Sequence, residues 1–295
     1  MTRLLLFLLL SLPLVGAYAI FSLGLVVIYR ASKVLNLAHG AMAMVPAYLF
    51  HTFIDASVPM PVALVLAIVS GGALGYAIER VFVRPLRTVS TTAQTVGTVA
   101  ALGLLVAGAG KVWGTGGQSA DRVFPEGQLD IGSSGIRYGE LGLFLVMLVV
   151  AGGLYVLLQR TGVGLAMRGA ADNPRAAALM GVNPQLATSA AWALGGLTAA
   201  VAGILLAAVT ILHPVILSLQ AVPALVAALI GGLGSLPGAL IGAAIVGSTL
   251  GLVPAFPSLQ QIEGSAQLLL AILALGVMAT RGERYVATDV RGGAL

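Results

Sequence analysis

The sequence contains no cysteine, so a disulfide framework, thiol catalysis and a cysteine-based zinc site are all excluded. Charged residues make up only 8% of the 295 residues, whereas about 25% is usual in soluble proteins. Between Ala176 and Ile262 no Asp, Glu, Lys or Arg occurs at all. A stretch of that length cannot be a single element of a soluble core, and it requires lipid as its solvent.

Motifs for catalysis and for metal binding are also missing from the sequence. It contains no phosphate-binding P-loop, no His and Glu spaced as zinc ligands, and no Gly-x-Ser-x-Gly elbow. We therefore expect no catalytic residues, no metal and no cofactor. Carboxylates inside the apolar stretches, which couple protons or sodium in many transporters, are nearly absent as well. If the protein moves a solute against its concentration gradient, the energy has to come from another protein.

Apolar and small residues make up most of the chain. Hydrophobic residues account for 59% of it, and glycine occurs 39 times. Small residues let transmembrane helices approach one another closely, so this composition is typical of a packed helical membrane protein. The net charge of +5 comes mainly from loops between apolar segments, where the positive-inside bias explains it, and it does not indicate a nucleic-acid partner.

The apolar segments predict an all-α, polytopic membrane protein that forms a single transmembrane domain over residues 1–295. We expect about 8–10 transmembrane segments, with the N-terminus outside and the C-terminus inside. The first apolar run is longer than the core of a signal peptide, so we interpret it as a spanning helix. The expected crossings cover residues 4–28, 61–78, 93–110, 141–158, 185–211, 215–230, 241–253 and 265–280, and residues 34–54 form one span, a half span or a re-entrant element.

Two loops differ in charge and are expected on opposite sides of the membrane. Residues 79–87 are strongly basic, which predicts a cytoplasmic loop. Residues 111–140 form the longest polar stretch and contain more acidic than basic residues, which predicts an extracytoplasmic loop. Within it we expect a small surface hairpin over residues 121–131 and solvated rather than catalytic carboxylates. The tail from residue 281 onward is expected in the cytoplasm.

The segment 34–54 is apolar but interrupted, and it predicts a broken helix. Asn36 and His39 are polar, Gly40 is flexible, and Pro46 removes a hydrogen bond from the helical ladder. Broken helices often lie beside transport pathways, where the free N–H groups at a half-helix N-terminus attract a solute carboxylate. We place Asn36, His39 and Gly40 near the translocation path or at a helix contact beside it, since polar bonds between helices give the same pattern.

A second irregular stretch begins at Gly231. Residues 231–238 contain four glycines and one proline, so they cannot form a regular helix throughout. They predict a turn or a close helix crossing. We assign Gly231, Gly232, Gly234 and Ser235 to the translocation path or to a helix contact, as for the broken segment.

The polar stretch 160–184 predicts a short capped helix outside the bilayer, between two spanning helices. Asp172 and Asn173 are good N-caps, Pro174 suits the first helical position, and Gly181 suits the left-handed residue that ends a helix. Most basic loops lack caps at both ends, so we prefer a docking element for a soluble partner to an ordinary cytoplasmic loop. The residues expected to couple the two proteins are Arg168, Asp172, Asn173, Pro174, Arg175 and Gly181.

Three motifs of the sequence resemble those of permeases for high-affinity branched-chain amino-acid importers. They are NLAHGAMAMVPAY, GLAMRGAADNPRAAALMGVNP and ALIGGLGSLPGALIGA, and they occur in the family's order and at its spacing, between residues 24 and 247. The run IYRASKVLNLAHG is similar to the H-type permease rather than to its M-type companion. The sequence departs from the family pattern at Leu37, at Pro46 and in its C-terminal tail, which leaves the exact substrate open.

The resemblance implies an importer that is driven by ATP and supplied by a solute receptor. Such a permease works in a bacterial-type inner (plasma) membrane with a second permease subunit, two cytoplasmic ATP-binding subunits and an extracytoplasmic solute-binding protein, and it is not itself an enzyme. Residues 160–184 are then the cytoplasmic coupling loop. Two alternatives stay open, namely a related permease for urea or amides and a secondary transporter or channel that acts alone.

Overall fold

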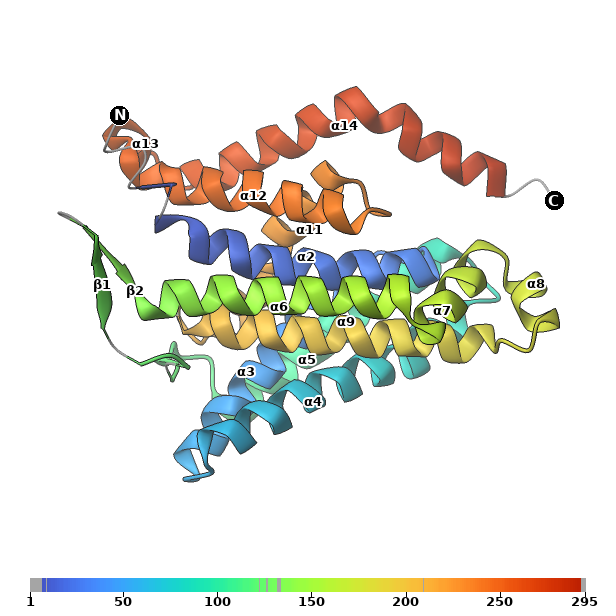
Figure 1. Cartoon of the computed structure of the whole chain (residues 1–295), viewed down its shortest axis with the longest axis horizontal. Coiled ribbons are helices and arrows are strands. Elements are labelled where there is room, and N and C mark those ends of the chain that lie inside the picture. Colours follow the sequence, from blue (N-terminus) through green and yellow to red (C-terminus); the bar gives the residue numbers. More distant parts are fainter. Residues whose placement is uncertain are drawn as a thin grey trace.

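Long helices packed side by side make up most of the protein (Figure 1). The structure is a computed structural model that describes residues 7–8, 10–121, 123–125, 127–131, 134–208 and 210–292. The chain begins with α2 (Leu12–Ser32), α3 (His39–Asp55), α4 (Met60–Ile78), the π-helical turn η1 (Glu79–Val83), the 3-10 turn η2 (Arg84–Leu86), α5 (Thr91–Trp113), β1 (Gln128–Ile131) and β2 (Ser134–Arg137). It continues with α6 (Tyr138–Arg160), α7 (Gly162–Asp172), α8 (Pro174–Leu179), α9 (Pro184–Ala207), α10 (Pro214–Leu219), α11 (Ala221–Gly231), α12 (Leu236–Leu252), η3 (Val253–Ala255), α13 (Pro257–Gln260) and α14 (Ser265–Gly292).

The helices confirm an all-α, multi-pass membrane protein. Within the part of the chain that the structure describes, seven helices are long and apolar enough to cross a membrane, namely Leu12–Ser32, Met60–Leu86, Thr91–Trp113, Leu141–Arg160, Pro184–Ala207, Pro214–Gly231 and Leu236–Ala255. The other two expected crossings correspond to shorter apolar helices. α3 has 17 residues, and the apolar part of α14 covers Ser265–Ala279.

Several helices begin where a polar side chain caps them. Ser90 Oγ accepts a hydrogen bond from the Ala93 N–H at the start of α5 (3.0 Å). Asn183 Oδ1 accepts one from the Gln185 N–H at the start of α9 (3.0 Å). These bonds satisfy N–H groups that have no partner inside the helix, which is why the helices start at these residues.

Helix α9 forms the centre of the bundle. It packs against α2, α3 and α4, and most of it is buried, whereas most of α5 and α6 is exposed. α9 lies so close to α4 that a Cβ atom built on Gly196 would overlap the carbonyl group of Gly71. Glycine at both positions makes this backbone contact possible. The exposed apolar faces of α5 and α6 are suited to lipid.

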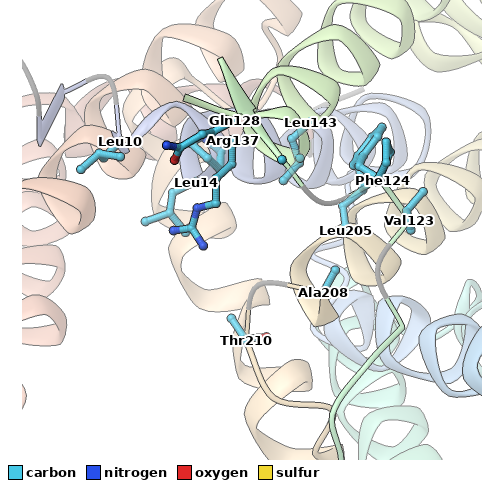
Figure 2. Close-up of a pocket in the computed structure, with 14 residues that line it drawn as sticks. Leu10, Leu14, Val123, Phe124, Gln128, Arg137, Leu143, Leu205, Ala208 and Thr210 are labelled. Carbon is cyan, nitrogen blue, oxygen red and sulfur yellow. The ribbon is translucent and has the colours of Figure 1, made fainter. Parts of the chain in front are cut away.

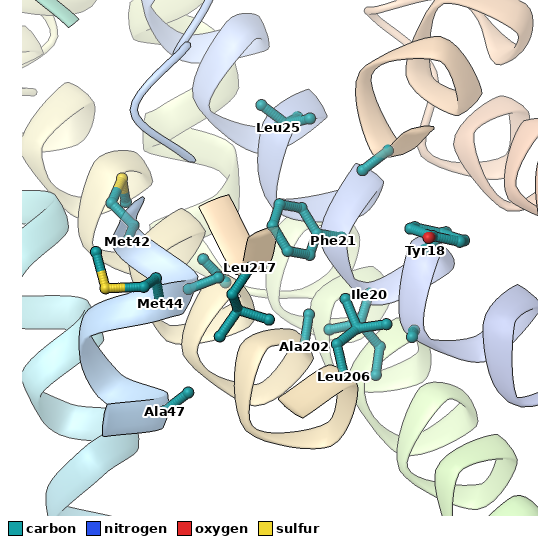
Figure 3. Packing of buried hydrophobic residues seen from close by; sticks show 14 of the residues in the cluster. Tyr18, Ile20, Phe21, Leu25, Met42, Met44, Ala47, Ala202, Leu206 and Leu217 are labelled. Carbon is teal, nitrogen blue, oxygen red and sulfur yellow. The ribbon is translucent and has the colours of Figure 1, made fainter. Parts of the chain in front are cut away.

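The core of the bundle is apolar and draws on helices that are far apart in the sequence. Figure 3 shows Phe21 of α2, Met44 of α3, Leu206 of α9 and Leu217 of α10 gathered in it. All four side chains are fully buried. In lipid, burial of apolar surface gives little driving force between helices, so the close packing of these side chains holds the helices together.

The two oppositely charged loop regions lie at opposite ends of the bundle. The β1–β2 hairpin is at one end, and α7, α8 and the end of α14 are at the other (Figure 1). We call these the hairpin end and the α8 end. The strands pair antiparallel, with Gln128 opposite Arg137. The hairpin thus starts later than predicted, because Pro125 has no N–H to donate to a strand ladder and Gly127 has a φ of 136°.

The interruption of the segment 34–54 lies at its start, and the prediction of a break at Pro46 is wrong. Residues 33–38 are not helical, and α3 then runs continuously from His39 to Asp55 with Pro46 inside it. A proline within a helix removes one backbone hydrogen bond. Here the Pro46 ring packs against α4, with its Cγ 3.2 Å from the position of a Cβ atom on Gly71. Contact with α4 keeps the helix continuous across the missing bond.

The two ends of the bundle allow a direct test of membrane orientation. Ser119 at the hairpin end and Ala176 at the α8 end are both exposed, and the chain has no cysteine to interfere. In intact cells a cysteine at position 119 should react with an impermeant maleimide, and one at position 176 should react only after permeabilisation, because basic loops stay inside. If position 176 is labelled in intact cells and position 119 is not, the protein has the opposite orientation in the membrane.

Candidate functional site

Helix α8 projects from the α8 end as a short rod with caps at both ends. Asn173 Oδ1 accepts a hydrogen bond from the backbone N–H three residues later (3.0 Å), and Pro174 is the first helical residue. At the other end Gly181 has a φ of 82°, and the Val182 N–H donates to the Ala177 carbonyl (3.0 Å). This pattern satisfies carbonyl groups that the helix leaves unpaired. The predicted short capped helix is confirmed.

A second helix, not expected from the sequence, precedes α8. Helix α7 begins after Thr161, whose hydroxyl caps it, and ends at Asp172. The prediction that Asp172 caps α8 is therefore wrong, because only Asn173 has the extended backbone (φ −147°) that an N-cap requires. Arg168 of α7 donates a hydrogen bond to the Gln159 side chain at the end of α6. This bond holds α7 against the bundle.

Two large apolar side chains are exposed at the tip of α8. Leu179 is 89% exposed and Met180 is 84% exposed, whereas Ala177 is buried against the bundle. Arg175 is exposed at the start of the same helix. An exposed apolar pair beside a charge, outside the apolar part of the bundle, is typical of a contact with another protein. The sequence pattern did not single out Leu179 and Met180, because both are simply good helix formers.

Asn36, His39 and Gly40 lie inside the bundle, at the start of α3. Asn36 Oδ1 accepts a hydrogen bond from the Ala38 N–H (3.0 Å), which makes it a local cap. The His39 ring is fully buried, and its Nε2 lies 3.2 Å from the carbonyl oxygen of Phe21 in α2. In this conformation these side chains make contacts within and between helices.

The start of α3 touches the end of α10. A Cβ atom on Gly40 would overlap the backbone carbonyl of Ser218, so no side chain fits at this contact. Ser218 Oγ is buried and has no hydrogen-bond partner within the described part of the chain. Gln220, which separates α10 from α11, accepts a hydrogen bond from the Tyr18 hydroxyl (2.8 Å). Two interrupted helices thus meet at a polar point inside an apolar bundle, which we call the α3–α10 junction.

The glycine-rich stretch forms the tight turn and the close crossing that the sequence predicts, between α11 and α12. Gly232 has a φ of 85°, and a Cβ atom on Gly231 would overlap the backbone of the facing helix. Ser235 caps α12, and Gly234 has open space around it. The turn is separated from Gln220 by the 11 residues of α11, or about 16 Å. The structure therefore puts these four residues one helix length away from the point where α10 ends.

A cavity of about 750 Å³ opens at the hairpin end, between the start of α2, the hairpin, α6 and the end of α9 (Figure 2). Its walls are mainly apolar, and Leu14 and Leu143 are among them. Arg137, Gln128 and Thr210 add polar groups to the lining. Cavities of about 300–1,000 Å³ are usual for small-molecule sites. No local sequence motif predicts this cavity, because its lining comes from segments that are distant in the sequence.

The basic stretch 79–87 contains a buried ion cluster that its charge count did not reveal. Glu79 is fully buried, and its carboxylate lies 3.0 Å from Arg84 and 2.8 Å from Arg87. It also accepts a hydrogen bond from the Ser189 hydroxyl of α9 (2.8 Å). Burial lowers the pKa of the Arg87 guanidinium, and the charge of Glu79 opposes that shift. The signal in the sequence was a single carboxylate at the start of a basic run.

A second polar contact forms at the hairpin end and shows that one carboxylate there, Asp121, is not fully solvated. His51 Nδ1 lies 2.7 Å from Asp121 Oδ2, and its Nε2 lies 3.6 Å from Asp55. Asp121 is partly buried in this contact, which ties the loop before the hairpin to the end of α3. Glu126, another carboxylate of this loop, lies outside the described residues.

The comparisons with known proteins agree on one family. Residues 7–278 match the family described as the branched-chain amino acid transport system permease component. The chain belongs to this family. It is 30% identical to LivH of Escherichia coli K12, a permease protein of the high-affinity branched-chain amino acid transport system, over 90% of each chain. It is 29% identical to BraD of Pseudomonas aeruginosa, a permease protein of the same kind of system, over 79% of this chain and 80% of that one.

Likeness to solved structures adds little to this result. The PsaBC complex of Streptococcus pneumoniae contains a chain that aligns with 91% of this chain and 89% of its own, with a TM-score of 0.49 and 12% identity. A likeness that low supports no argument. The family match over nearly the whole chain confirms the resemblance that the three motifs carry, and it places the chain in a family of transport permeases.

The left-handed end of α8 gives a local test of its rigidity. A Cβ atom added at Gly181 would meet no other atom within 4 Å, but the residue has a φ of 82°, so Gly181→Ala adds backbone strain alone. That strain is about 1–2 kcal/mol, and amide exchange over residues 176–182 should speed up by about five- to thirtyfold. Gly169→Ala in α7 is the matched control, since Gly169 also has open space. Equal exchange in both variants would show that α8 does not depend on this cap.

Proposed function

We propose that this chain is the membrane permease subunit of a binding-protein-dependent ABC importer and forms the translocation path for branched-chain or related amino acids. The observation that carries the proposal is α8, a capped helix outside the apolar bundle with Leu179 and Met180 exposed at its tip. The family match supports the substrate class. The sequence has no P-loop, so the energy source belongs to a partner.

The proposed partners are a second permease subunit, two cytoplasmic ATP-binding subunits and an extracytoplasmic solute-binding protein. An ATP-binding subunit contacts α8, and the solute-binding protein delivers the solute at the hairpin end. This arrangement places the chain in a bacterial-type inner membrane with the α8 end in the cytoplasm. The charge difference between the loops at the two ends supports that orientation.

Docking at α8 requires a rigid helix with an apolar anchor. A helix of six residues is marginal in water on its own, so the caps at Asn173 and Gly181 and the surface of the partner hold it together. Leu179 and Met180 provide apolar area that becomes buried in the partner. Arg175 acts mainly on docking register and association rate, as charges at the rim of an interface do.

The α3–α10 junction is the proposed closed point of the translocation path. Non-helical backbone at membrane depth is tolerated only where it is buried in protein or lines a water-filled cavity. Residues 33–38 are such backbone, and at the start of α3 the backbone of Gly40 is in direct contact with that of Ser218. Separation of α3 from α10 would expose the N–H groups at the start of α3 and the Ser218 hydroxyl to a solute carboxylate.

The cavity at the hairpin end suits the entry of an aliphatic amino acid. Arg137 supplies a guanidinium, the side chain best shaped for a carboxylate. Leu14 and Leu143 supply apolar walls for an aliphatic side chain. Urea and simple amides have no carboxylate, and urea has no aliphatic chain either. The cavity therefore favours amino acids over the urea or amide alternative.

Uptake by the assembled complex tests the substrate class. With its ATP-binding subunits and solute-binding protein in vesicles, the chain should support ATP-dependent uptake of leucine, isoleucine and valine but not of urea. Arg137→Gln should weaken amino-acid uptake. Lys111→Gln, which changes a basic side chain at the same end that does not line the cavity, should not. Uptake of urea alone would select the related permease, and uptake without ATP would select a secondary transporter or channel.

Replacement of the apolar tip tests the docking role of α8. Burial of a Leu or Met side chain contributes about 1.5–3 kcal/mol, so Leu179→Ser combined with Met180→Ser should weaken binding of the ATP-binding subunits by at least about tenfold. Stimulated ATP hydrolysis and uptake should fall with it. The exchange Leu179→Met with Met180→Leu keeps the apolar area and should preserve binding. If the serine variant binds and hydrolyses ATP as the parent does, α8 is an ordinary loop.

A further inference from the structure

The inner end of α4 carries an irregular segment built around one buried carboxylate. After Ile78 the α-helix changes into the π-helical turn η1 and then the 3-10 turn η2. π-helical turns are rare and occur frequently at functional sites. Glu79 is the first residue of η1, and its side chain is 0% exposed. An ionised group in this position has to be fully compensated by partners.

The partners of Glu79 come from two separate parts of the chain. Arg84 donates to both carboxylate oxygens, through Nε (3.3 Å) and Nη2 (3.0 Å), and Arg87 Nη2 donates to Oε1 (2.8 Å). The Ser189 hydroxyl of α9 donates to Oε2 (2.8 Å) and accepts from Arg84 Nη2 (2.6 Å). The carboxylate, two guanidinium groups and one hydroxyl thus form a closed network between η1–η2 and α9.

The network sits where α9 begins, next to α8. Only residues 180–183 separate α8 from α9, and Ser189 lies in the second turn of α9. In the following turns the backbones of α4 and α9 touch directly, since a Cβ atom on Gly75 would overlap the carbonyl of Trp192. The first turns of α9 are therefore fixed to α4 both by the ionic network and by backbone contact.

We propose that Glu79 is a positioning residue that joins the inner end of α4 to α9, so that a displacement of α8 moves α9 and the α4–α5 loop as one body. The inference rests on the proposed docking of an ATP-binding subunit at α8. Without the network, the η1–η2 segment has no described hydrogen bond to α9, because the close backbone contacts of α9 at this end are with α4 and not with this segment. With the network in place, α9 and the α4–α5 loop move together when α8 is displaced. α8 then acts on two helix pairs and not on α9 alone.

A purely structural role for Glu79 makes a different prediction from a coupling role. A structural residue would lower the yield or thermal stability of the complex while leaving the solute transported per ATP unchanged. A positioning residue changes that ratio. Glu79→Gln removes the charge and keeps the shape, Glu79→Asp keeps the charge, and Ser189→Ala removes the two hydrogen bonds that join Glu79 and Arg84 to α9.

The first measurement is uptake per ATP hydrolysed, in vesicles that hold the complete complex. Glu79→Gln and Ser189→Ala should lower the ratio by about two- to thirtyfold, the range of typical coupling energies, while basal hydrolysis continues. Glu79→Asp should restore part of it. Arg80→Gln is the matched control, because Arg80 is the next residue and is exposed. An unchanged ratio in the folded Ser189→Ala complex would overturn the proposal.

The second measurement follows the two segments directly. Spin labels on cysteines at Thr88 and Ala176, both exposed, report the distance between the α4–α5 loop and α8. In the parent complex the distribution of this distance should be narrow and should not change when nucleotide is added. Ser189→Ala should broaden or shift the distribution. Equal, narrow distances in both proteins would overturn the joint movement. If the parent complex shows no receptor-stimulated hydrolysis, the proposed function fails, but the label distances still test the network by themselves.

Discussion

Close backbone contact along α9 is the constraint on which the rest of the bundle depends. Lipid gives little hydrophobic driving force between helices, so their association relies on short-range packing. Glycines, which have no side chain, allow the helix backbones to approach closely. Gly71 and Gly196 bring α4 into contact with α9, and Gly203 brings α9 into contact with the backbone of Ala43 in α3. Because backbone touches backbone at these points, side-chain rearrangement cannot absorb a relative movement, and neighbouring helices have to move together or separate completely.

This packing also explains how the bundle tolerates two interrupted helices. The non-helical residues before α3 leave backbone groups that lipid could not satisfy. The hydroxyl oxygen of Thr98 in α5 lies within hydrogen-bond distance of two of them, the Leu37 N–H (3.1 Å) and the Leu35 carbonyl (3.3 Å), and the Tyr18 hydroxyl bonds to the Gln220 side chain. Ser218 Oγ is a buried polar atom without a partner among the described residues, and such an atom carries a desolvation cost. Ser218 lies where α3 and α10 meet, and Trp192 Nε1 of α9 is a second buried polar atom without a partner among the described residues.

The charged groups at the two ends have a different role from the apolar contacts between them. At the α8 end, Glu79 holds two arginines and Ser189 in one network next to α8, whose apolar tip is exposed. At the hairpin end, His51 holds Asp121 and so fastens the loop in front of the cavity. Both networks add polar bonds between segments that are distant in the sequence.

The sequence by itself determined the features that depend on neighbours in the chain. Hydropathy places the protein in a membrane, and the caps at Asn173, Asn183 and Gly181 follow from hydrogen bonds that reach only a few residues. Tertiary structure alone decided the rest: α3 runs through Pro46 because α4 supports it, Gly40 closes on Ser218, and Glu79 is buried against Ser189, 110 residues away. The physical reason is range, since capping and hydropathy act locally, whereas burial and ion pairing depend on which distant helices the packing brings together.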